Sequence, residues 1–274
     1  MEFIPVCEPT LIGNERKYLL DAFDTGWISS AGEYVSKVES QFSSYCNREH
    51  GITVSNGTVA LHIALKALGI EKGDEVIVPN FNGVYGAFAV SYQGAMPVFV
   101  DAESDTWNID VNKIEEKITS RTKAIMAVHI YGHPCDMDSI IQIAEKHNLK
   151  IIEDAAEVHG GEYKNKKCGS FGDISIFSFF ANKLITSGEG GIVLTDDKEL
   201  ADKCRYYKNL CFSLDGPRNF IHDDIGYNYR LSNISSAIVL AQIEKLDEYV
   251  EMRINNNKKY REYLRGVEGL TFQP

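Results

Sequence analysis

The strongest indication of the fold comes from the stretch FSFFANK at residues 177–183, which leads into the glycine-rich turn SGEGG at residues 187–191. This stretch ends on Lys183, and an earlier apolar run ends on the acidic pair Glu153 and Asp154. Enzymes that use pyridoxal phosphate need an amine that holds the cofactor aldehyde and a carboxylate that keeps the pyridine nitrogen protonated. Lys183 and Asp154 are candidates for these roles. Singly, each also has an ordinary interpretation, as a solvated lysine and a helix-capping aspartate.

Short β-branched runs alternate with amphipathic stretches on both sides of Lys183. The predicted strands cover residues 75–79, 96–100, 124–130, 150–153, 174–179 and 191–195, and the predicted helices cover residues 58–68, 138–147 and 198–208. Several of the strands are apolar throughout, as strands covered on both faces are. This alternation predicts an α/β fold with a largely parallel sheet.

The C-terminal region has a different pattern. From Asn233, a candidate N-cap, apolar residues recur at helical spacing toward Tyr263 and predict one long helix. Residues 267–274 are interpreted as the start of a further strand that has no partner, so we expect the chain to be cut short. The predicted organisation is a large domain over residues 1–250, followed over residues 251–274 by a linking helix and the start of a truncated small domain.

Composition limits the possible functions. The 274 residues are 44% hydrophobic, enough for a full core, and carry a formal net charge of −11. No block of basic residues occurs, which argues against nucleic acid or anionic membrane as a partner. The six cysteines form no CxxC pair and are interpreted as reduced thiols, and no metal site is predicted. Neither a signal peptide nor a membrane span is recognised, so a cytoplasmic location is expected.

Two further segments suggest sites for an anion. Residues 55–58, SNGT, lie between a strand-like run and an apolar helix, where free N–H groups and the helix dipole favour a phosphate. The alternative is an ordinary helix N-cap. Ser178 lies five residues before Lys183 and could donate its hydroxyl to the same phosphate, although a strand serine bonded to the backbone is a common alternative.

Asp154, Glu157 and Asn228 are predicted to line the site. Asp154 ends a strand, and ligands of parallel sheets gather at the carboxyl ends of strands. Glu157 lies one helical turn further and could face the phenolic oxygen of the cofactor, or simply favour the dipole of a helix that begins there. Asn228 belongs to the segment GYNYR at residues 226–230, which is interpreted as a loop lining the site or as a polar helix entry.

Five motifs in order resemble the DegT/DnrJ/EryC1/StrS family of sugar aminotransferases, and most closely its GDP-perosamine synthases. The motifs are GWISS (26–30), VSNGTVALH (54–62), GDEVIVP (73–79), YGHPCDM (131–137) and the segment from Lys183 to Gly191. The resemblance runs from about Ile4 to about Tyr263. It implies the type I fold of pyridoxal-phosphate aminotransferases, with a seven-stranded mixed sheet flanked by helices, and a homodimer with two shared active sites.

The resemblance also implies a role for each site residue. Lys183 binds the cofactor covalently, Asp154 pairs with the pyridine nitrogen, and Glu157 faces the cofactor hydroxyl. The phosphate is bound by Gly57, Thr58 and Ser178, and by Asn228 of the neighbouring subunit. Where the family carries an aromatic that stacks on the cofactor ring, this chain has Gly83, so that Tyr85 or Phe81 would take its place.

The activity implied is the transfer of an amino group from L-glutamate to C4 of a nucleotide-linked 4-keto-6-deoxy sugar, with GDP as the nucleotide, for the synthesis of surface polysaccharide. A lysine at position 183 indicates a transaminase, because related sugar 3-dehydratases have histidine there. Two alternatives remain open at this point. One is a non-catalytic protein that binds the cofactor or serves as a dimer partner, and the other is an aminotransferase for a UDP- or dTDP-linked sugar.

Overall fold

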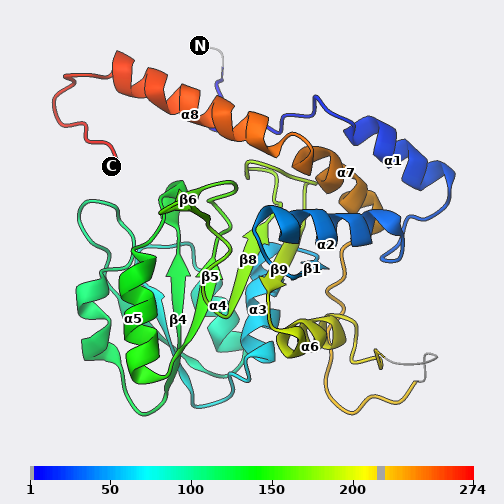
Figure 1. Cartoon of the computed structure of the whole chain (residues 1–274), viewed down its shortest axis with the longest axis horizontal. Coiled ribbons are helices and arrows are strands. Elements are labelled where there is room, and N and C mark those ends of the chain that lie inside the picture. The colour runs from blue at the N-terminus through cyan, green and yellow to red at the C-terminus, as the bar shows by residue number, and fades with distance from the viewer. Residues whose placement is uncertain (1–2, 215–219) are drawn as a thin grey trace.

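The computed structural model describes residues 3–214 and 220–274, and its centre is a seven-stranded sheet (Figure 1). The strand order is β1-β9-β8-β5-β4-β2-β3. Within this sheet β9 is antiparallel to both of its neighbours, and the other four neighbouring pairs are parallel. The strands are β1 (His50–Val54), β2 (Glu75–Pro79), β3 (Met96–Val100), β4 (Thr122–Val128), β5 (Lys150–Asp154), β8 (Ile174–Ser178) and β9 (Gly191–Thr195). The mixed, mostly parallel α/β sheet that the sequence predicts is thus confirmed.

Helices cover both faces of the sheet. One face packs against α3 (Gly57–Ala67), α4 (Tyr85–Tyr92) and α6 (Lys198–Lys208). The other face packs against α5 (Met137–His147) over β2, β4 and β5, and against α2 (Glu33–Tyr45) and α7 (Asn233–Ile243) over β8 and β9. Strands β2, β8 and β9 are buried at every residue, because both of their faces are covered.

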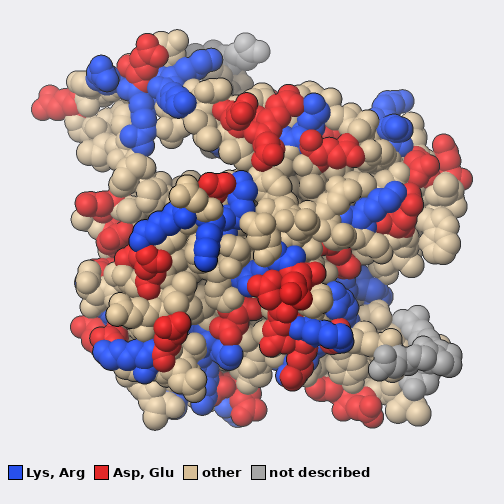
Figure 2. All heavy atoms as spheres, in the orientation of Figure 1, with Lys and Arg blue, Asp and Glu red and all other residues tan. Residues whose placement is uncertain are grey.

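The remaining elements lie around this framework. They are the helices α1 (Glu15–Asp24) and α8 (Leu246–Tyr263), the hairpin of β6 (Glu162–Tyr163) and β7 (Lys166–Lys167), and the short 3₁₀ turns η1 (Val111–Lys113), η2 (Glu115–Lys117) and η3 (Ile130–Gly132). Figure 1 shows α8 running away from the sheet toward the C-terminus. Acidic and basic side chains are interspersed over the face drawn in Figure 2. Among the described residues, no helix is both long and apolar enough to cross a membrane.

The single long helix predicted from Asn233 is wrong. The structure has two helices, α7 and α8, separated at Lys245, whose φ of −111° and ψ of 4° lie outside the helical range. Ser232, rather than Asn233, is the N-cap, and its side chain accepts a hydrogen bond from the Ser235 amide. Leu240 of α7 and Leu246 of α8 lie in the same core cluster. The apolar periodicity therefore continues from α7 into α8, and it does not predict the break between the two helices.

Two other local predictions are also corrected. The strand predicted over residues 124–130 is Thr122–Val128, because the chain then turns through Tyr131, whose φ of 53° is left-handed. Residues 267–274 form no strand. No described strand pairs with them, and the Gln273 side-chain amide donates to the main-chain oxygen of Thr106.

Candidate active site

The predicted site residues gather at the carboxyl ends of two neighbouring strands. Asp154 is the last residue of β5 and Ser178 is the last residue of β8. Lys183 follows in the loop between β8 and β9, where its amide donates to the Phe180 oxygen at 3.0 Å. Because β5 and β8 are parallel, their carboxyl ends meet at one edge of the sheet, which is where ligands bind in open α/β folds.

The Lys183 amine is held by a carboxylate. Its Nζ lies 3.1 Å from Glu157 Oε1, and the other oxygen of Glu157 accepts a hydrogen bond from the Tyr131 amide at 2.9 Å. The alternative interpretation of Glu157, as an acid in the first turn of a helix, is wrong, because residues 155–161 form turns in which the Val158 amide donates to the Ala155 oxygen. Glu157 therefore reaches Lys183 from a turn and not from the first turn of a helix.

Asp154 is a buried carboxyl group, 7% exposed, whose Oδ1 accepts one hydrogen bond from the Ala156 amide at 3.1 Å. Burial raises its pKa to about 6, although the Ala156 amide and the positive charge of Lys183 act in the opposite direction. A buried carboxylate is stabilised by a cation that contacts it. This position can therefore bind a protonated ring nitrogen favourably.

A cradle of main chain lies beside these charges. Asn56 caps α3 by accepting a hydrogen bond from the Val59 amide at 3.0 Å. A Cβ added to Gly57 would lie 2.9 Å from Ser178 Cβ, and one added to Gly191 would lie 2.7 Å from the Asn56 oxygen. Only glycine allows β8, β9 and the start of α3 to approach this closely. Gly57, half-buried Thr58 and Ser178 are thus brought together at the positive end of a helix.

The Ser178 hydroxyl also accepts a hydrogen bond from the Phe180 amide at 3.3 Å. Ser178 is therefore also hydrogen-bonded to the backbone, as the alternative interpretation of this serine predicts. This contact uses the oxygen as an acceptor, so the hydroxyl proton remains free to be donated to a phosphate.

The ring of Tyr85 lies beside Gly83, the position at which the resemblance implies an aromatic. A Cβ added to Gly83 would lie 2.5 and 2.7 Å from two carbons of that ring, which is exposed at the start of α4. The other candidate, Phe81, packs instead edge to face with Trp107 and Tyr131, with centroid distances of 5.6 and 6.2 Å. Tyr85 is thus the residue that places a ring where a side chain at position 83 would lie.

Asn228 lies outside the ends of β5 and β8, which carry Asp154 and Ser178. It forms an antiparallel bridge with Asn209 and is exposed. The two tyrosines beside it, Tyr227 and Tyr229, stack at 5.0 Å, and the Tyr229 oxygen accepts a hydrogen bond from the Ser55 amide. Within residues 3–214 and 220–274, the Asn228 side chain makes no hydrogen bond.

Sequence reasoning missed two residues at this edge. Tyr131 contributes its main-chain amide, and its only signal is the Tyr-Gly pair that allows a left-handed turn. His159 is buried between Phe177 and Phe179, and neither of its ring nitrogens has a partner among the described residues. Burial lowers the pKa of His159 to about 3, so its ring is neutral.

Together these residues offer an amine, a buried carboxyl group and an anion cradle at one edge of the sheet. Pyridoxal phosphate carries an aldehyde, a basic ring nitrogen and a phosphate, so the donor set fits this cofactor.

Comparisons with known proteins identify the family of this chain. The profile of the "DegT/DnrJ/EryC1/StrS aminotransferase family" matches residues 9–274. The GDP-perosamine synthase of Escherichia coli O157:H7 is 51% identical over 253 residues, which are 92% of this chain and 69% of that protein. The structure of S. venezuelae DesV in complex with a ketimine intermediate superposes with a TM-score of 0.91 at 34% identity, over 95% of this chain and 69% of that one.

A further similar structure was solved in a form named for the cofactor PLP. The putative sugar aminotransferase Spr1654 from Streptococcus pneumoniae, in its PLP form, has a TM-score of 0.91 at 26% identity, over 97% of this chain and 72% of that chain. The resemblance inferred from the motifs is confirmed. The chain is a pyridoxal-phosphate-dependent aminotransferase that belongs to the DegT/DnrJ/EryC1/StrS family.

Proposed function

We propose that this chain transfers an amino group from L-glutamate to C4 of a GDP-linked 4-keto-6-deoxy sugar. The supporting observation is the Lys183 amine, held 3.1 Å from Glu157 at the edge of the sheet that also carries Asp154. The choice of GDP is supported by the 51% identity to a protein named GDP-perosamine synthase.

Asp154, Glu157 and Lys183 have different roles in this reaction. Bound pyridoxal phosphate supplies an electron sink that stabilises negative charge on the reacting carbon. Asp154 keeps the ring nitrogen protonated and Glu157 orients the hydroxyl side of the ring. Lys183 first holds the cofactor and then, as a free amine, moves a proton at its Nζ between the two reacting carbons.

The phosphate and the ring face are bound by neutral groups. Gly57 and Thr58 offer main-chain N–H groups at the start of α3, and Ser178 offers its hydroxyl. Tyr85 covers one face of the ring from the position that Gly83 leaves open. These contacts orient the cofactor and exclude water from one side of it.

The proposal is tested with cofactor-loaded protein in two steps. L-Glutamate alone should shift the visible absorbance of the bound cofactor and yield 2-oxoglutarate. A GDP-linked 4-keto-6-deoxy sugar should then restore the original spectrum and gain an amine at C4. Restoration only by a UDP- or dTDP-linked sugar would reassign the nucleotide, and no response to glutamate would support the non-catalytic alternative.

We also propose that residues 1–250 form the cofactor-binding unit, and that residues 251–274 continue into a linking helix and a smaller unit. Support comes from α8, in which Leu246 and Tyr249 are buried in the core while residues 251–263 are exposed.

A homodimer with shared sites completes the proposal, with Asn228 binding the phosphate of the partner's cofactor. Its support is the Asn228 side chain, which is exposed and has no hydrogen-bond partner in the part of the chain that the structure describes. Mixing two impaired variants, Lys183→Ala and Asn228→Ala, should partly restore cofactor binding relative to either parent, because in a mixed dimer one site carries both lesions and the other carries neither. Absorbance titration after proven subunit exchange measures this recovery. Binding that only averages the two parents would place Asn228 in its own subunit's site.

A further inference from the structure

Three buried polar side chains lie behind the site and take no part in the chemistry described above. His129 follows β4, Glu153 lies in β5, and Asn108 lies in the loop after β3; His129 and Glu153 are 0% exposed and Asn108 is 2% exposed. Glu153 and Asp154 are consecutive strand residues, so their side chains point to opposite faces of the sheet. Buried polar groups of this kind are costly unless they are fully hydrogen-bonded.

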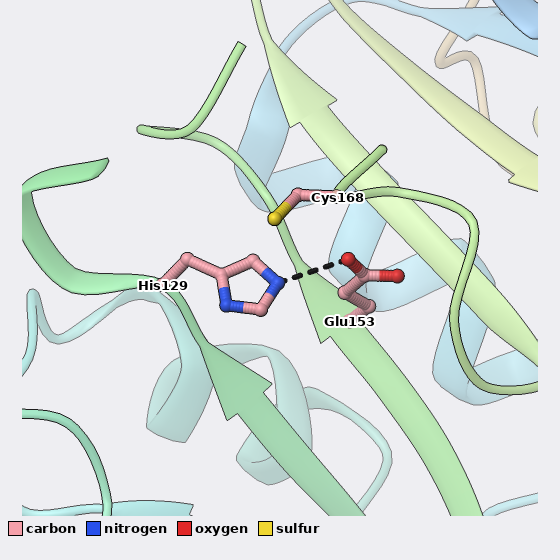
Figure 3. Close-up of side chains that lie close together, drawn as sticks. All are labelled: His129, Glu153 and Cys168. Carbon is pink, nitrogen blue, oxygen red and sulfur yellow. Dashed lines mark hydrogen bonds and ion pairs between the residues drawn. The ribbon is translucent and has the colours of Figure 1, made fainter. Parts of the chain in front are cut away.

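His129 and Glu153 form a closed hydrogen-bonded pair. Figure 3 shows the His129 ring pointing at the Glu153 carboxylate, and His129 Nε2 lies 2.9 Å from Glu153 Oε1. Glu153 also accepts hydrogen bonds from the Gly169 and Phe171 amides. The Cys135 amide donates to His129 Nδ1 at 3.0 Å, which requires this nitrogen to be unprotonated. The proton of the neutral ring therefore lies on Nε2 and is donated to Glu153.

A metal ion is the other use that this cluster suggests, because ligand atoms of His129, Glu153 and Cys168 lie within 4.8 Å of one another. Both oxygens of Glu153, however, already accept hydrogen bonds from main-chain N–H groups. Burial also raises the pKa of the Cys168 thiol, which disfavours the thiolate that a metal would need. The geometry therefore favours a hydrogen-bonded pair over a metal centre.

The pair anchors the loop from Ile130 to Cys135. His129 holds the end of this loop through the Cys135 amide. Asn108 holds its middle and its start, because its side-chain nitrogen donates to the His133 and Pro134 oxygens at 3.0 Å and its oxygen accepts from the Ile130 amide at 3.1 Å. Both ends of the loop are thus fixed from the buried side of the sheet.

Within this loop Tyr131 adopts a left-handed conformation, with φ 53° and ψ 22°. A left-handed backbone is unfavourable for a non-glycine residue and persists where the surroundings impose it. It aims the Tyr131 amide at Glu157, whose second oxygen lies beside the Lys183 amine. The buried pair is thus joined to the lysine through the anchored loop, the Tyr131 amide and Glu157.

We propose that His129 and Glu153 are positioning residues, which fix the Tyr131 turn and thereby hold the Glu157 carboxylate at Lys183. This inference rests on the proposed function only for its effect on the cofactor. The geometry of the turn itself does not depend on it.

Two substitutions separate the contacts of His129. The amide nitrogen of Gln reaches about as far as Nε2, so His129→Gln keeps a donor to Glu153 and loses the Cys135 contact. The oxygen of Asn lies about where Nδ1 does, so His129→Asn keeps the Cys135 contact and loses Glu153. We expect His129→Gln to speed hydrogen exchange of the Tyr131 amide in cofactor-free protein by roughly ten-fold or more, and His129→Asn to speed it less.

The second readout is the affinity of cofactor-free protein for pyridoxal phosphate. His129→Gln should weaken it by roughly ten-fold, and this loss should disappear in a Glu157→Ala background, because residues that act through one another are not additive. Thr195→Val is the matched control. Thr195 is fully buried and bonds the Asp173 oxygen at the opposite edge of the sheet, so this variant should lower stability without changing either readout.

The outcomes are distinct. If wild-type protein binds no pyridoxal phosphate, the proposed function fails, while the exchange measurement still tests the turn. If Tyr131 exchange is unchanged in His129→Gln, or if the loss of affinity is as large in the Glu157→Ala background, the positioning role is wrong. Should His129→Gln not fold, Asn108→Ala removes the other anchor of the loop and must meet the same two criteria.

Discussion

The Lys183→Ala variant is expected to lose covalent cofactor attachment and to transfer amino groups at least about a thousand-fold more slowly than the wild type. The reason is that the amine that holds the aldehyde and moves the proton is then gone. Borohydride reduction of the wild type, followed by peptide mapping, should find the cofactor on Lys183. The variant should show no such adduct.

Folding should be nearly unaffected, because Lys183 lies in a loop and its removal leaves Glu157 bonded to the Tyr131 amide. Lys208→Ala is a suitable control, since this lysine is equally enclosed, with 12% side-chain exposure against 16% for Lys183, and pairs with Glu39 at 3.0 Å. It should lose some stability and keep the adduct. An adduct on any lysine other than Lys183 would contradict the assignment.

The Asp154→Asn variant should bind the cofactor and yet react with glutamate about a thousand-fold more slowly, because an unprotonated ring is a poor electron sink. Rapid-mixing absorbance measures binding and the glutamate step separately. A variant that keeps most of the wild-type rate would mean that another group meets the ring nitrogen.

The same substitution should stabilise the cofactor-free protein above about pH 6. Burial raises the pKa of Asp154 to about 6, above its value of about 3.9 in the unfolded chain. The protonated Asp154 carboxyl group therefore contributes its full share of stability below about pH 4, and this share is lost as the pH rises through about 6. Above this pH the wild type must keep an ionised carboxylate buried, whereas the asparagine side chain does not ionise. At about 1.4 kcal/mol per pKa unit, we therefore expect the substitution to raise the free energy of unfolding by up to about 3 kcal/mol.

Urea unfolding of both cofactor-free proteins between pH 5 and pH 8 measures this difference. The advantage of the variant should shrink as the pH falls. An advantage that is constant with pH would indicate a packing effect instead of the ionisation of Asp154.

The sequence was sufficient for residues whose place depends on the end of a strand. Asp154 and Ser178 end apolar runs, and Gly57 begins an apolar helix, so the pattern of the runs places all three at one edge of the sheet. Lys183 follows from its position after such a run. These predictions need only the period of the secondary structure and the parallel order of the strands.

The contacts that the sequence did not predict depend on tertiary structure. Tyr131 acts through its main-chain N–H, which a left-handed turn orients, and a tyrosine side chain does not predict such a turn. His129 and Glu153 meet across two strands, and their spacing along the chain matches no motif. The break at Lys245 was missed because both helices bury their apolar residues in one cluster.

The crowding between Gly83 and Tyr85 has a consequence for substitutions at these two positions. A side chain at position 83 and the present Tyr85 ring cannot occupy the same space, since a Cβ at Gly83 would lie only 2.5 Å from the ring. The two positions are therefore coupled in space, so that any side chain at position 83 requires the ring at position 85 to move or to be replaced. We expect Gly83→Ala alone to displace the Tyr85 ring, and Gly83→Phe to be accommodated better when Tyr85 is replaced by alanine.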